Sequence, residues 1–149
     1  MRRLLNLSPS RAKYSEIVCL CPPRSKNHLF RLNTKCPCKK FSGILEQVKQ
    51  KYGDKVAIYS IVTMPDTMQQ VKDYIAANKV SNPILFDSGQ VMASYLKLTP
   101  QNPTVTFPHA FLIDRNGVIK NDFVYGPATS PIFEGNGLFG EIDKLLAAK

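Results

Sequence analysis

The stretch that most constrains the fold is residues 55–63, which is almost continuously apolar and rich in β-branched side chains. A strand of this composition is covered on both faces, as in a parallel sheet with helices above and below it. The segment before it, residues 37–52, repeats apolar side chains at steps of three and four residues, which predicts a helix. After it, residues 65–67 open a second helix. The apolar stripe expected for that helix is Met68, Val71, Tyr74 and Ile75.

The second half of the chain first continues the alternation of strands and helices and then contains a hairpin and a last helix. Residues 82–87 predict a short strand and residues 91–96 a helix. Residues 109–114 and 118–124 then flank Asn116-Gly117, which is a strong hairpin signal. One face of a last helix is formed by Leu138, Ile142, Leu145 and Leu146. The order predicts an α/β domain with a central mixed sheet, helices on both faces, and a C-terminal β-hairpin plus helix.

The N-terminal residues fit this pattern least well. Residues 15–21 are apolar enough for a strand, but Pro22-Pro23 follows at once. A loosely attached arm and a docked first strand both agree with these features. We expect a basic arm over residues 1–26 and one domain over residues 27–149, whose first strand is residues 28–33.

The net charge of +9 belongs to one part of the 149-residue chain. Residues 1–40 hold ten Lys and Arg against a single acid, Glu16, whereas the rest is balanced. A basic arm favours acidic partners, but it carries no zinc-finger spacing, aromatic ribonucleoprotein motif or arginine-rich helix, so we expect no nucleic-acid binding. The apolar run after Arg2-Arg3 is too short for a signal peptide. No run approaches the ~18 apolar residues of a membrane span, so we expect a soluble chain.

The four cysteines form two pairs, Cys19 with Cys21 and Cys36 with Cys38, each with one residue between them. A domain of this size does not require disulfides for stability, which leaves redox chemistry or metal binding. Thiolates suit Zn²⁺ and Cu(I). Paired zinc ligands usually have about two to four residues between them, so we assign neither a metal site nor a cofactor.

Cys36 is the expected nucleophile. It precedes Pro37, which is placed at the first position of the predicted helix, and it follows Thr34 and Lys35. The unpaired amide groups of a helix N-terminus stabilise a thiolate, and neighbouring lysines act in the same direction. Thr34, Lys35 and Pro37 are therefore supporting residues.

The partner of Cys36 is less constrained. Cys38 is the natural resolving thiol, but helical residues two apart project about 200° apart around the axis. A Cys36–Cys38 disulfide therefore requires a non-helical Cys36 and a distorted turn. Two alternatives stay open: a disulfide between this site and Cys19 or Cys21, and a helix start without any turnover.

Residues 107–119 carry the clearest resemblance to a known family. They contain Phe107-Pro108, then His109-Ala110, then a Phe-Leu-Ile-Asp run and a turn with Gly117. This pattern resembles the thioredoxin-like superfamily, and most closely its TlpA-like branch of thiol-disulfide oxidoreductases. The resemblance of this sequence to the peroxiredoxins of the AhpC/TSA superfamily is weaker. The resemblance covers roughly residues 27–149 and implies a thioredoxin-like fold.

Two departures from the family pattern bear on the chemistry. The active site of the resembled family is Cys-x-x-Cys, usually after an aromatic residue, whereas here one spacer is missing. The acid that the family carries on the preceding strand is absent from residues 28–33. The Thr-x-x-Cys spacing of peroxiredoxins is also absent, because Thr34 lies only two residues before Cys36.

The resemblance implies roles for two further residues. The family's proline, here Pro108, is cis and packs against the dithiol, so that Phe107 and Pro108 form a ledge for the substrate. His109 is either a proton carrier or a hydrogen-bonded residue at the start of a strand.

The resemblance also implies the activity. It is disulfide exchange with protein thiols and protein disulfides, often outside the cytoplasm. The alternative is a redox-inactive binding module of the same fold that holds Cu(I) or zinc through its Cys-x-Cys pairs. The compartment and the oligomeric state stay open.

Overall fold

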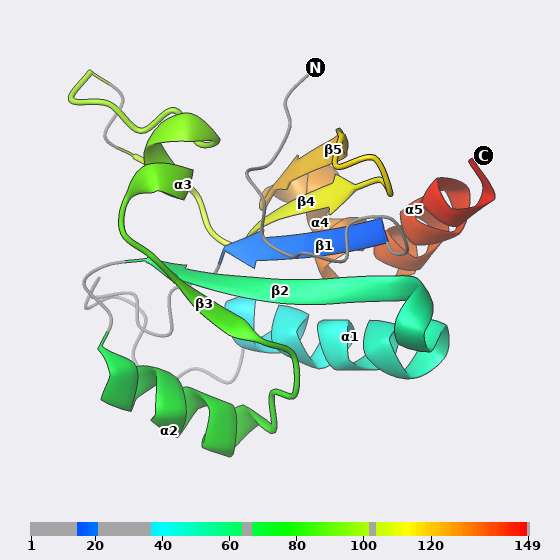
Figure 1. Cartoon of the computed structure of the whole chain (residues 1–149), viewed down its shortest axis with the longest axis horizontal. Coiled ribbons are helices and arrows are strands. Elements are labelled where there is room, and N and C mark those ends of the chain that lie inside the picture. The colour runs from blue at the N-terminus through cyan, green and yellow to red at the C-terminus, as the bar shows by residue number, and fades with distance from the viewer. Residues whose placement is uncertain (1–14, 21–36, 64–66, 102–103, 149) are drawn as a thin grey trace.

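The computed structural model describes residues 15–20, 37–63, 67–101 and 104–148. Its centre is a five-stranded mixed sheet with the strand order β3-β2-β1-β4-β5 (Figure 1). Strands β1 (Ser15–Leu20), β2 (Val56–Thr63) and β3 (Ile84–Asp87) are parallel to one another. Strands β4 (His109–Ile113) and β5 (Ile119–Val124) form an antiparallel hairpin, and β4 pairs with β1. This is the α/β architecture expected from the sequence.

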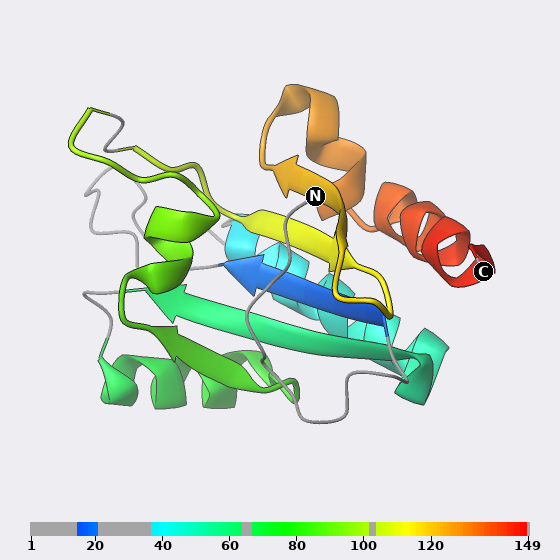
Figure 2. The ribbon, with the colours of Figure 1, turned by 45° about the horizontal axis from the view of Figure 1, so that its top comes forward.

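Helices cover both faces of this sheet. Helices α1 (Pro37–Tyr52), α4 (Ser130–Phe133) and α5 (Asn136–Ala147) pack on one face, and α2 (Met68–Asn78) lies beside α1. Helix α3 (Gln90–Ser94) lies on the other face (Figure 2). No helix among these residues is long and apolar enough to cross a membrane. The short helix α4 is an element that the periodicity of the sequence did not predict.

The first strand differs from our expectation. Residues 15–20 are not part of a loosely attached arm: β1 is the central strand, paired with β2 from Ser15 opposite Val56 to Leu20 opposite Ile61, and with β4 on its other side. Its apolar side chains are almost fully buried. The boundary expected at residue 26 is therefore wrong for these six residues. The strand expected at residues 28–33 lies outside the described residues.

Two apolar clusters follow from the alternation of side chains along β1 and β4. Ile17, Cys19, Ala110 and Leu112 face the helices α1, α4 and α5. Val18, Leu20, Phe111 and Ile113 face α3. The α1 stripe contributes as predicted, with Phe41, Ile44, Leu45 and Val48 in the first cluster.

Local sequence signals explain where α2 begins and where the chain turns between β4 and β5. Thr67 caps α2: its Oγ1 accepts the backbone N–H of Gln70, while Gln70 Oε1 accepts the N–H of Thr67. Gly117 adopts a φ of +75° in the hairpin turn that Asn116-Gly117 predicted. One part of the expected α2 stripe is wrong: Met68 is 57% exposed, because it lies in the first turn beyond the packed part of the helix.

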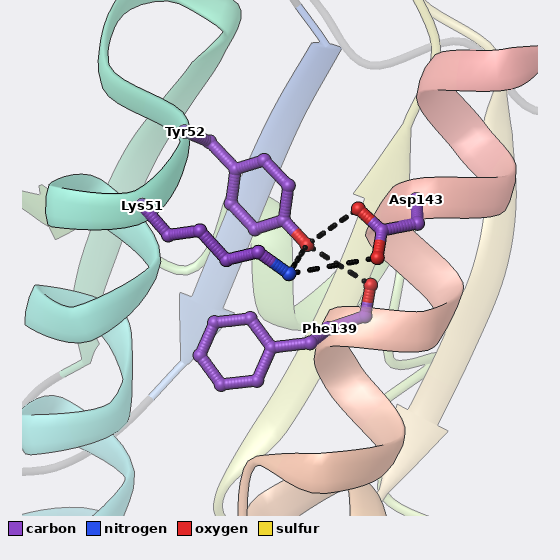
Figure 3. Close-up of polar contacts among 4 residues, drawn as sticks. All are labelled: Lys51, Tyr52, Phe139 and Asp143. Carbon is purple, nitrogen blue, oxygen red and sulfur yellow. Dashed lines mark hydrogen bonds and ion pairs between the residues drawn. The ribbon is translucent and has the colours of Figure 1, made fainter.

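A polar cluster joins the end of α1 to α5 (Figure 3). The Tyr52 hydroxyl accepts a hydrogen bond from Lys51 Nζ at 3.0 Å and donates to Asp143 Oδ1 at 2.7 Å. Lys51 Nζ also lies 3.5 Å from Asp143 Oδ2 and 5.0 Å from the ring centroid of Phe139. Burial raises the pKa of Tyr52, and the hydrogen bond with Tyr52 raises the pKa of Lys51. The cluster stabilises the end of α1 that lies away from the cysteines.

Candidate functional site

The candidate site lies where α1 begins, at the end of the sheet to which β1 and β2 run (Figure 1). Of the residues expected there, Pro37 and Cys38 form the first turn of α1. Cys36, Lys35 and Thr34 lie outside the described residues, so their roles stay predictions. No acidic side chain occurs in this first turn, and an anion there gains from the unpaired amide groups of the helix.

Cys38 lies in a polar contact between α1 and α2. Its side chain is 7% exposed. One helical turn later, Ser42 Oγ donates a hydrogen bond to the Cys38 carbonyl oxygen at 3.1 Å. Ser42 Oγ also shares a hydrogen bond with the hydroxyl of Tyr74, from α2. The structure thus connects the backbone carbonyl of Cys38 to the hydroxyl of Ser42, and through it to the hydroxyl of Tyr74. The sequence assigned no role to Ser42 and placed Tyr74 in a buried stripe.

A weak sequence signal for this contact exists in retrospect. Ser42 is a polar residue beside the apolar stripe of α1, in register with Cys38 at a step of four residues. Tyr74 was predicted as part of a buried stripe, and it is half-buried. No pattern in either helix indicates that the two hydroxyls meet.

Cys19 is a core residue. It lies on β1 between Ser60 of β2 and Ala110 of β4, it is 2% exposed, and it carries no disulfide. Its thiol belongs to the apolar cluster beneath α1. Cys19 is therefore not part of a loosely attached arm, and a disulfide between Cys19 and the site stays untested because Cys36 lies outside the described residues. Cys21 lies outside them as well.

The central strand carries an acid, although residues 28–33, where the family's acid was sought, lie outside the described residues. The strand that precedes α1 in the sheet is β1, and β1 contains Glu16. Glu16 lies near the beginning of β1, at the end away from the start of α1 (Figure 1). The acid is thus present in the strand, but at the opposite end from Cys38.

Pro108 lies at the same end of the sheet as the start of α1. His109, the next residue, pairs with Leu20, the last residue of β1. The Phe107–Pro108 peptide bond is cis. Pro108 is buried, its carbonyl oxygen accepts the N–H of Tyr125 at 3.1 Å, and Phe107 packs against the apolar cluster on the α3 side. This part of the site is therefore held between β4 and the end of β5.

His109 is a hydrogen-bonded residue at the start of a strand. Its side chain is 8% exposed, and its Nε2 pairs with Asp122 Oδ1 of β5. Its ring lies 4.8 Å from that of Phe111, which belongs to the cluster facing α3. Because side chains alternate along β4, His109 points away from the face that α1 covers. This orientation does not favour the proton-carrier alternative.

The described residues do not form a metal site. Nowhere among them do three His, Cys, Asp or Glu side chains come together. Cys19 is enclosed in the apolar core. The described part of the chain therefore offers no ligand set that includes Cys38.

Comparison with known proteins now supplies the family. The sequence model described as the AhpC/TSA family matches residues 29–122. The chain belongs to the AhpC/TSA family. This match agrees with the wider superfamily expected from the sequence, and the assignment to its TlpA-like branch stays a prediction. A search of curated proteins gives no match.

Solved structures show the thioredoxin-like fold. A putative thioredoxin from Neisseria meningitidis is 13% identical with a TM-score of 0.63, covering 94% of this chain and 79% of that one. StoA from Bacillus subtilis is 22% identical with a TM-score of 0.56, covering 83% and 82%. A DsbF homologue from Corynebacterium diphtheriae is 15% identical with a TM-score of 0.65, covering 91% and 74%. The family match supports a redox function in general.

Proposed function

We propose that this protein exchanges disulfides with protein thiols, with Cys36 as the nucleophile and Cys38 as the resolving thiol. The observation that carries the proposal is the position of Cys38. It lies in the first turn of α1, at the sheet end that also holds the cis Phe107–Pro108 bond. A helix N-terminus favours a thiolate, and membership of the AhpC/TSA family supports redox use of that thiolate.

The proposed reaction runs in two balanced steps. The Cys36 thiolate attacks one sulfur of a substrate disulfide, which forms a mixed disulfide and releases the other substrate sulfur as a thiolate. The Cys38 thiolate then attacks Cys36 Sγ, which forms the Cys36–Cys38 disulfide and releases the second substrate thiolate. The substrate gains two electrons and the protein loses two, and the reverse direction oxidises a substrate dithiol.

Phe107 and Pro108 would position the substrate. The carbonyl oxygen of Pro108 is already used by Tyr125, so the backbone that remains for a substrate strand is that of Phe107. An extended segment next to a substrate cysteine would pair with this backbone, which is how strands are recognised at an open edge.

Cysteine variants test the proposal by insulin reduction in the presence of a thiol reductant. Cys36→Ser abolishes the activity, and Cys38→Ser retains a mixed disulfide with insulin, because the second step is missing. Cys19→Ala serves as the control, since its thiol lies in the core, and it keeps the activity. Mass spectrometry after mild oxidation locates the Cys36–Cys38 disulfide.

Two results would contradict this proposal. Activity that survives Cys36→Ser would exclude the assigned nucleophile. An inactive wild-type chain without a disulfide that involves Cys36 would favour the redox-inactive binding module, and Cu(I) or Zn²⁺ titration of the full chain then tests its metal-binding form.

A further inference from the structure

We propose that residues 1–14 of this chain add a strand to the open edge of β2 over residues 56–59, in the groove between this edge and Pro83. The inference does not rest on disulfide exchange, because the groove lies at the end of the sheet away from the start of α1 (Figure 1). It gives the basic N-terminal residues, which the redox site does not use, a place in the fold.

The edge is open because the pairing between β2 and β3 starts half-way along β2. Strand β3 pairs with Ser60–Thr63 and with no earlier residue of β2. If this parallel ladder continued toward the beginning of β2, the carbonyl oxygen of Ile58 would need the N–H of residue 83. Residue 83 is a proline without an N–H, so the ladder stops there. Within the described part of the chain, no other strand lies on this side of β2.

Side chains of α1 hold the segment before β3. Glu46 Oε1 accepts the backbone N–H of Ser81 at 2.7 Å, and Glu46 Oε2 accepts the Ser81 hydroxyl at 2.6 Å. Lys49 Nζ donates to the Ser81 carbonyl oxygen at 3.2 Å. Both backbone groups of Ser81 are therefore bound to α1 instead of extending the ladder along β2.

The open edge lines a groove of about 430 Å³. Its lining includes the half-buried residues Ala57 and Tyr59, together with Pro83 and Asn82. Asn82 is 6% exposed, and its Nδ2 donates to Ser60 Oγ at 2.8 Å. Its Oδ1 is buried and has no hydrogen-bond partner among the described residues. A buried acceptor of this kind is unfavourable until a donor reaches it, and an extended segment carries such donors along its backbone.

The alternation of backbone groups shows which amides face the groove. The N–H of Ser60 donates to the carbonyl oxygen of Pro83 at 2.9 Å, on the β3 side. Successive residues of a strand direct their N–H and C=O groups to opposite sides, so those of Ile58 also point to the β3 side. The N–H groups of Ala57 and Tyr59 point to β1, with which both residues pair. The N–H of Ile58 is thus the amide that an added strand would bind.

The chain's own N-terminal residues reach this groove easily. Ser15 pairs with Val56, so the arm joins the sheet at the end of β2 where the groove lies. A segment that passes around this end of β2 covers two strand spacings, about 10 Å, which takes about three extended residues. The rest of residues 1–14 is long enough to follow the four open residues of β2. The covalent link to β1 also gives this segment a high effective concentration at the groove.

Charge and composition agree with this occupant. Residues 1–14 contain four basic side chains and no acidic one, and they include the apolar run Leu4-Leu5. Asp54 is an exposed acid that lines the groove. Lys49 lines it as well, but its Nζ is bound to the Ser81 hydroxyl at 2.8 Å. A basic segment is therefore attracted to Asp54 at this rim.

Amide hydrogen exchange of the full chain, measured residue by residue by NMR, tests the pairing. A full-length variant carries a Gly/Ser segment of equal length in place of residues 2–14. We expect the N–H of Ile58 to exchange about tenfold more slowly in the wild type than in this variant, the equivalent of one hydrogen bond. Ala57 and Tyr59 are internal controls, because their N–H groups face β1 and keep their exchange rates in both chains.

A pair of charge variants tests the contribution of the rim in the otherwise unchanged chain. Asp54→Lys should speed the exchange of the Ile58 N–H by about twofold to fivefold, because it replaces attraction to the basic segment by repulsion. Asp73→Lys is the matched control, since Asp73 is an exposed acid of α2 that does not line the groove, and it should leave the rate unchanged.

Equal exchange of the Ile58 N–H in the wild type and in the Gly/Ser variant overturns the proposal. Slow exchange in both chains that becomes slower with rising protein concentration also overturns it, because a second copy then occupies the edge. If Ala57 and Tyr59 exchange faster in the Gly/Ser variant, that variant has lost its sheet, and the charge variants decide: equal rates in Asp54→Lys and Asp73→Lys overturn the proposal.

Discussion

At the scale of single residues, Asp114 shows how one side chain fixes a turn. Its Oδ1 accepts the backbone N–H groups of Asn116 at 2.8 Å and Val118 at 2.9 Å, and its Oδ2 lies 3.3 Å from Lys120 Nζ. Burial acts to raise the pKa of Asp114, but the hydrogen bond from Val118, the contact with Lys120 and the hydrogen bond from Asn116 outweigh it and lower the pKa. The ionised form therefore stabilises the hairpin.

Asp114→Asn is expected to reduce the free energy of unfolding by about 1 kcal/mol at neutral pH, since hydrogen bonds to a charged acceptor are stronger than those to an amide. Because the pKa of Asp114 in the folded state is below its ordinary 3.8, this difference is present above that value. It disappears as the pH falls through the lower folded-state pKa. Urea titrations of both proteins over this pH range measure it.

Lys120→Gln is the control for the ion pair. Lys120 is well exposed, so its loss should change the free energy of unfolding by less than about 0.5 kcal/mol. If Lys120→Gln lowers the free energy of unfolding as much as Asp114→Asn does, or more, then the ion pair, and not the turn hydrogen bonds, stabilises the hairpin.

At the scale of elements, the position of α5 depends on close contact with α4. A Cβ atom on Gly137 would lie 3.0 Å from Ile132 Cδ1 and 3.0 Å from the Pro131 carbonyl carbon. The backbone of Pro131 cannot move away as a flexible side chain can. Gly140, one turn later in the same helix, has no atom within 4 Å of such a Cβ.

Two substitutions in one helix should therefore have opposite effects. Gly137→Ala forces α4 and α5 apart and should cost about 1–3 kcal/mol of unfolding free energy. Gly140→Ala should stabilise by about 0.5–1 kcal/mol, because alanine is the better helix former. Thermal and urea unfolding measure both. If both variants change the free energy of unfolding by the same amount, then helix propensity, and not the contact with α4, determines the effect of the substitution at Gly137.

At the scale of the whole molecule, β1 holds the two halves of the sheet together. It is the only strand in the described sheet that pairs with both β2 and β4. It buries Ile17, Val18 and Leu20 almost completely. At about 1.5–3 kcal/mol for each side chain, these residues account for much of the stability of a typical domain.

A chain that begins at residue 27 should therefore show no cooperative unfolding transition, because β2 and β4 have no common partner. A chain that begins at Ser15 keeps all five strands and serves as the comparison. Circular dichroism with thermal unfolding distinguishes them. A cooperative transition in the shorter chain would show that the sheet closes without β1.

Much of the fold followed from periodicity. The bounds of α1, β2 and the hairpin agree with the predicted segments to within about two residues, since each is long or has a clear turn signal. The sequence left open whether β1 belongs to the fold, because Pro22-Pro23 follows two residues after its end and would stop a strand there. Pairing with β2 and β4 nevertheless holds residues 15–20 in the sheet. The burial of Met68 was overestimated, since periodicity does not show where packing on a helix begins.

The sequence by itself determined the alternation of strands and helices, the hairpin and the placement of Cys38 in the first turn of a helix, because local spacing and turn chemistry decide these features. Only the tertiary structure decided that Cys19 is a core thiol, that His109 points away from α1, and that Tyr74 meets Ser42 beside Cys38. Each of these depends on which face of one element meets another. That choice is made by packing between segments far apart in the chain, and no local pattern records it.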